Sequence, residues 1–161
     1  MPYALDKLKK IAKGTDKVER FGVILKAKDP NAKPEYKIFE CVPENPKETK
    51  AHFKWWGSDQ ERGGYVPKPG ADGKIHLDDE KIMLDKDYPI EFDWHTHPPT
   101  GDAWPSGYDA ETSKHNDVPG VVIRYVGRPT RGKIEDDYTI WITDTDGKAY
   151  EYHPHTAMGK Q

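Results

Sequence analysis

The sequence predicts an α+β fold in which a mixed central sheet is flanked by helices. Apolar residues recur at helical spacing near the N-terminus, whereas later apolar runs are β-branched or aromatic and bounded by turn residues. The elements follow in the order helix, strands, long polar insertion, strand, helix and strands, with no internal repeat. A chain of 161 residues has room for one ordinary core, so residues 1–161 are expected to form a single domain.

The N-terminal part predicts a helix followed by a hairpin. Residues 3–13 carry apolar side chains three and four positions apart with lysines between them, which predicts an amphipathic helix that ends at Gly14. Residues 18–27 are apolar and β-branched enough for a strand. Turn residues follow at 29–31, and the alternating segment 36–42 is expected to return as the antiparallel partner of that strand.

A long polar insertion, residues 43–73, interrupts the pattern. Pro, Gly, Lys, Asp and Glu dominate it, and loops of this length inside a compact domain are often lids or binding loops. We expect it to fold over the rim of the site described below and to govern access, while an ordinary surface insertion would have the same composition. Residues 78–84 are predicted to form a short helix.

The second half of the chain predicts the rest of the sheet and one helix. Residues 89–96 read as a strand, 105–116 as a helix and 121–126 as a buried strand. Residues 138–143 and 148–153 are expected to pair as a hairpin, because the Asp-Gly pair between them is a strong turn signal.

Charge and composition exclude several classes of protein. Lys and Arg total 25 against 28 Asp and Glu, which argues against nucleic-acid binding because such proteins carry a basic surplus. No apolar run approaches the roughly 20 residues of a membrane span, and none near Met1 resembles a secretory signal, so a soluble domain is expected. The single cysteine, Cys41, excludes an internal disulfide and is expected in the core.

The strand at 89–96 and the residue that follows it carry a candidate metal site. Side chains two positions apart on a strand share a face, so His95 and His97 project in parallel while Trp94 and Thr96 face a core. Asp109, one turn into the next helix, can turn its carboxylate back as a third ligand. Three protein ligands leave one position open, which is typical of catalytic zinc.

These residue types also have plainer interpretations. Ser106-x-x-Asp109 before a helix matches a capping arrangement that needs no metal, and Ser106 can serve both roles. A second pair, His153 and His155, is not followed by a Ser-x-x-Asp sequence. We assign this pair to the C-terminal tail and not to a metal site. Asp93 shares the face of the two histidines and either orients an imidazole or lies at the rim; we favour the rim.

His95-Thr96-His97-Pro98 followed by Ser106-x-x-Asp109 resembles the JAMM motif of the JAB/MPN metalloproteases. Eleven residues, 98–108, separate His97 from Asp109, one more than the family usually has. The resemblance implies the α-β-α sandwich of the MPN/JAB domain, which is similar to that of cytidine deaminases. It also implies a Zn²⁺ ion held by His95, His97 and Asp109.

The family also places a glutamate on its first strand in the pattern Glu-x-x-Gly, which Glu19 and Gly22 match directly after the helix. The resemblance implies that Glu19 is the general base and that Ser106 stabilises the oxyanion. The plainer alternative is that Glu19 is a solvated charge on the strand with no catalytic role.

The compact size and long insertion are similar to bacterial JAB-like toxin domains of polymorphic and Rhs-type toxins. This resemblance implies a protein or peptide substrate, such as a ubiquitin-like conjugate, and hydrolysis of a peptide or isopeptide bond. It implies a cognate immunity protein as partner, and either a cytoplasmic location or delivery into a target cell. Two alternatives stay open: a zinc hydrolase acting on a non-peptide bond, and a non-catalytic scaffold that binds a partner.

Overall fold

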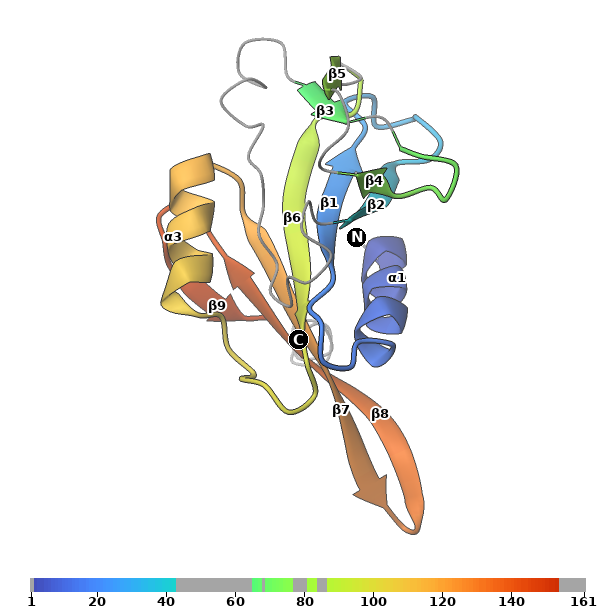
Figure 1. Ribbon diagram of the computed structural model, residues 1–161, viewed down its shortest axis with the longest axis vertical. Helices are drawn as coiled ribbons and strands as arrows, with labels where there is room; N and C mark the ends of the chain where they lie inside the picture. The colour runs from blue at the N-terminus through green and yellow to red at the C-terminus, as the bar shows by residue number, and fades with distance from the viewer. Residues whose placement is uncertain (1, 43–64, 68, 77–80, 84–86, 154–161) are drawn as a thin grey trace.

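Two helices and a mixed seven-stranded sheet make up most of the computed structural model, which describes residues 2–42, 65–67, 69–76, 81–83 and 87–153 (Figure 1). The sheet order is β4-β2-β1-β6-β7-β8-β9, and β3 and β5 form a separate pair. In chain order the elements are α1 (Pro2–Lys13), β1 (Phe21–Lys26), β2 (Tyr36–Val42), β3 (Tyr65–Pro67), β4 (Ile75–His76), β5 (Lys81–Met83), β6 (Ile90–His97), α3 (Gly107–Asn116), β7 (Gly120–Thr130), β8 (Lys133–Thr143) and β9 (Ala149–Glu151).

The strand pairing confirms the predicted α+β class and mixed sheet. β1 pairs antiparallel with both β2 and β6, whereas β6 and β7 run parallel. The hairpin of β8 and β9 closes at the predicted turn, where Gly147 has a φ of 83°. β6 therefore lies between two partners, so the backbone that carries the two histidines is hydrogen-bonded on both edges.

One face of the sheet buries the apolar side of α1. Leu8 is fully buried in a cluster with Ile24, Trp94 and Val121, which come from three neighbouring strands. Burying a side chain such as Leu8 contributes about 1.5–3 kcal/mol, so this face is a main source of stability. Trp94 lies directly opposite Gly22 in the register of β6 and β1, as the prediction that Trp94 faces a core requires.

The opposite face of the sheet carries the candidate site. Phe21 pairs with His95 and Val23 pairs with Asp93, and directly opposed side chains of an antiparallel pair share a face. α3 covers this face, so that α1 and α3 lie on either side of β6 (Figure 1). The alternation along β6 thus separates an apolar face under α1 from a polar face under α3.

Two segments differ from the sequence prediction. The helix predicted at 78–84 is wrong for its described part, because Lys81–Met83 pairs antiparallel with Tyr65–Pro67. The strand predicted at 121–126 is longer, since β7 continues to Thr130 and forms a hairpin with β8 across Arg131 and Gly132, both with positive φ. This hairpin projects beyond the rest of the sheet (Figure 1).

The predicted insertion at 43–73 is described only in part. Residues 43–64 and 68 lie outside the described residues. The expectation that the insertion folds over the rim of the site therefore also falls outside them. Within it, Tyr65–Pro67 forms β3, and just beyond it Ile75 is buried on the edge strand β4, which pairs parallel with β2.

Candidate metal centre

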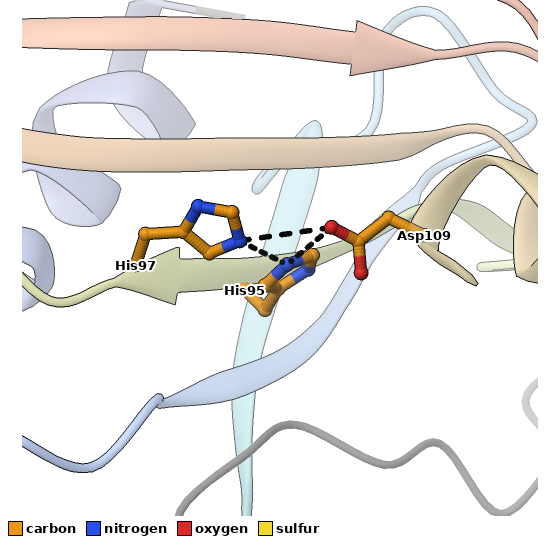
Figure 2. Close-up of side chains that lie close together, drawn as sticks. All are labelled: His95, His97 and Asp109. Carbon is orange, nitrogen blue, oxygen red and sulfur yellow. Dashed lines mark hydrogen bonds and ion pairs between the residues drawn. The ribbon is translucent and has the colours of Figure 1, made fainter. Parts of the chain in front are cut away.

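His95 and His97 project from the same face of β6, as predicted, and both side chains are buried. Figure 2 shows that both imidazoles and the carboxylate of Asp109, which comes from α3, point toward one another. The two Nε2 atoms lie 3.2 Å apart. Asp109 Oδ2 lies 3.4 Å from Nε2 of His95 and 3.6 Å from Nε2 of His97.

These separations fit a tetrahedral metal ion. Ligand atoms about 2.0–2.1 Å from a tetrahedral centre lie about 3.3–3.4 Å from one another. The three measured separations, 3.2, 3.4 and 3.6 Å, bracket that value. The group can therefore hold a metal ion through two imidazole nitrogens and one carboxylate oxygen.

The start of α3 places Asp109 in this group. Ser106 is the N-cap: its Oγ accepts a hydrogen bond from the backbone N–H of Asp109 at 3.1 Å, and Asp109 Oδ2 accepts one from the N–H of Ser106 at 2.8 Å. The predicted capping arrangement is therefore confirmed, and it coexists with the approach of Asp109 to the histidines. The longer loop, 98–108, does not prevent that approach.

A hydrogen bond outside the group fixes the orientation of His97. Its Nδ1 lies 2.8 Å from the backbone carbonyl oxygen of Asp102. A carbonyl only accepts, so Nδ1 carries the proton and, in the neutral ring, Nε2 presents its lone pair to the group. Metal-binding histidines commonly have such a partner. Asp102 thus contributes through its backbone carbonyl.

Charge in the group shifts two pKa values. Burial raises the pKa of Asp109, but contacts with His95 and His97 outweigh burial and hold that pKa well below its usual range. Burial lowers the pKa of His97, yet Asp109, the carbonyl of Asp102 and the charge of Glu19 together raise it. Both shifts show that the carboxylate of Asp109 and the imidazoles interact favourably.

Glu19 lies two residues before β1, in the segment that runs alongside the end of β6. The register of β1 and β6 pairs Phe21 with His95, and extended by two residues it sets Glu19 opposite His97. Its carboxylate is close enough to raise the pKa of His97. Two hydrogen bonds hold this stretch of backbone, since the N–H of Thr96 donates to the carbonyl of Arg20 at 2.8 Å and the N–H of Arg20 donates to Oγ1 of Thr96 at 3.0 Å.

The position predicted for Asp93 at the rim is wrong. Its side chain is only 5% exposed, because α3 covers this part of the sheet. Burial, and then the charge of Asp109, raises the pKa of Asp93 well above its usual value. Asp93 Oδ2 is buried and finds no hydrogen-bond partner in the described part of the chain.

A small pocket beside the candidate metal ligands was not predicted from the sequence. Its walls include His95 and Asp109, and it reaches inward to Asp93, Gly120 and Thr143. Its enclosed part has room for a group about the size of one water molecule. The residues meet because β6, β7 and β8 are adjacent under α3, a long-range arrangement that leaves no local sequence signal.

The other candidates lie away from the group or outside the described residues. His153 is exposed and pairs with Glu151 at 2.9 Å, while His155 lies outside the described residues. Cys41 is buried in the core as predicted.

Comparison with models of known protein families and with curated proteins found no match to this chain. None of the helices in the described residues combines the length and apolar character that crossing a membrane requires.

Proposed function

We propose that the chain is a zinc-dependent hydrolase that cleaves an amide bond, with His95, His97 and Asp109 as the zinc ligands. The observation that carries this proposal is the tetrahedral spacing of the three ligand atoms, 3.2–3.6 Å. The charge of Glu19, which acts on His97, supports the choice of this residue as the base. Two imidazoles and one carboxylate suit zinc and leave a coordination position open, as in catalytic sites.

When bound, zinc supplies a Lewis acid that makes water acidic enough to react near neutral pH. Glu19 accepts the proton of the attacking water and returns it to the departing amine. Its backbone is fixed through Thr96, so the carboxylate needs little reorganisation to act.

Ser106 stabilises the negative charge that develops on the carbonyl oxygen. Its Oγ accepts the capping bond from Asp109, and a hydroxyl that accepts keeps its O–H as a donor. Ser106 is exposed, so this hydrogen atom can reach a bound substrate. The cap and the oxyanion contact are thus compatible roles for one side chain.

The resemblance to JAB/MPN enzymes adds a peptide or isopeptide bond as the substrate class. The toxin context and the immunity protein stay predictions, since they concern other parts of a longer protein or other chains.

The test compares Glu19→Gln with Asp16→Asn, which changes an exposed acid of the same segment. Both variants and the wild type are loaded with zinc and assayed on fluorogenic peptide amides and on ubiquitin dimers of defined linkage. We expect Glu19→Gln to retain zinc and to lose about 10²–10⁴-fold in turnover, while Asp16→Asn behaves as wild type. Normal turnover in Glu19→Gln refutes its role as base. Zinc binding without hydrolysis of any of these substrates favours the partner-binding scaffold.

A further inference from the structure

The pocket behind the candidate ligands is lined mainly by side chains that can accept hydrogen bonds. Asp93 and Asp109 contribute carboxylates, and Thr112 and Thr143 contribute hydroxyls. Neither lysine nor arginine is among the described residues that line it. The two carboxyl groups set the preference, because a carboxylate only accepts hydrogen bonds while the hydroxyls can do either. A positively charged donor of hydrogen bonds therefore complements these walls.

The carboxyl group of Asp93 includes an oxygen atom that lacks such a donor. Its Oδ2 is buried and unpartnered in the described part of the chain. Leaving a buried carboxylate oxygen without a hydrogen bond is costly, and most proteins avoid it. Asp93 also lies outside the group of three metal-ligating residues, so the metal itself does not satisfy it.

Gly120 keeps the inner end of the pocket open. A Cβ atom at this position would lie 2.7 Å from Asp93 Oδ1 and 2.6 Å from Thr143 Oγ1, closer than real Cβ contacts. Thr143 is itself held by Ser113, whose Oγ lies 2.6 Å from Thr143 Oγ1. The inner wall is thus a fixed set of polar atoms around a space that only glycine leaves open.

We propose that this pocket binds a primary ammonium group of the substrate. An ammonium head carries three N–H donors and no acceptor, and it is about the size of a water molecule, which matches both the walls and the room available. The inference rests on the proposed function, because it treats this ammonium group as part of the substrate. A pocket of this kind would favour amide substrates that carry an unblocked amino group near the scissile bond. A tertiary or quaternary ammonium offers fewer donors or none and is too large for the enclosed end.

Binding is measured on the zinc-loaded protein with ethylammonium chloride as the probe, followed through the backbone amide resonances of Gly120 and Thr112. Tetramethylammonium chloride and potassium chloride at equal concentration are the controls. We expect saturable shifts with ethylammonium and none with either control salt. Resonance shifts of equal size with tetramethylammonium overturn the proposal. The absence of shifts with ethylammonium also overturns it, because water then fills the pocket.

A variant pair tests the residue that carries the proposal. Asp93→Asn keeps the size of the side chain but cannot ionise, whereas the carboxyl group of Asp93 can become a carboxylate when an ammonium ion pairs with it. We therefore expect ethylammonium to bind at least about tenfold more weakly to the variant. Glu111→Gln changes an exposed acid of α3 that does not line the pocket and should leave binding unchanged. Unchanged binding in Asp93→Asn overturns the proposal, because the amine then binds to the metal or elsewhere. Hydrolysis does not enter this measurement, so failure of the proposed function and failure of this inference remain distinguishable.

Discussion

Replacing Asp109 by Asn separates its two roles at the start of α3. The carboxylate faces both histidines and also accepts the N–H of Ser106 in the helix cap. An asparagine keeps an oxygen that can accept the capping bond but carries no charge. We therefore expect Asp109→Asn to stay folded and to lose affinity for zinc.

The size of that loss follows from the geometry of the group. Asp109 is the one anionic member of the three, and its Oδ2 lies 3.4 and 3.6 Å from the two Nε2 atoms, close to the separation that tetrahedral zinc imposes. Losing a residue that merely supports a ligand typically costs about 10–100-fold in metal affinity. Losing the anionic ligand itself should exceed this, so we expect a loss of about 100-fold or more, equivalent to about 2.8 kcal/mol or more.

The assay is a competition titration of chelator-treated protein against a fluorescent zinc indicator, with two control variants. Ser106→Ala removes the N-cap and should lower the free energy of unfolding by about 1 kcal/mol while retaining most zinc affinity. Asp102→Asn keeps the carbonyl that His97 uses and should bind zinc as wild type does. Wild-type affinity in Asp109→Asn, or an equal loss in Asp102→Asn, would refute the ligand assignment.

Two further predictions test the fold around the site. Gly22→Ala should lower the free energy of unfolding by about 1–3 kcal/mol or more in urea titrations, because its Cβ would lie 1.9 Å from the carbonyl oxygen of Phe39 and 2.7 Å from the indole of Trp94. Gly107→Ala is the matched control, since a Cβ there meets nothing within 4 Å, and an equal loss in both variants would contradict the argument. Cys41 should react with a thiol reagent at least about 100-fold more slowly in the native protein than in urea. Burial first, and then nearby negative charge, raises the pKa of its thiol, so little reactive thiolate is present. Fast labelling of the native protein would contradict the position of Cys41 in the core.

Those parts of the site that depend on local spacing could be predicted from the sequence. The shared face of His95 and His97 follows from strand alternation, and the cap of Ser106 and Asp109 follows from helix geometry. Contacts between distant segments could not be predicted in this way. The burial of Asp93 depends on α3 docking over β7 and β8, which no local pattern specifies.

The same distinction explains which strands could be predicted: those with a local sequence signal were predicted, and those that depend on distant contacts were not. The Asp-Gly turn before β9 is a strong local signal and was predicted. The turn of β7 and β8 uses Arg131 and Gly132, a less typical pair, so the long hairpin was missed. Lys81–Met83 and Tyr65–Pro67 are strands because they pair with each other across a gap in the sequence, a contact that overrode the helical pattern expected at 78–84.

Packing on the apolar face of β6 fixes the geometry of its polar face. A slip of one residue in β6 would turn Trp94 toward α3 and the histidines toward α1. The close fit of Trp94 over Gly22 opposes that slip, since no other residue leaves room for the indole. Thr96, on the same face as Trp94, also ties β6 to the segment that carries Glu19. The pattern Glu-x-x-Gly therefore has a physical explanation. Gly22 sets the register of β1 against β6, and that register keeps the segment that carries Glu19 next to the end of β6.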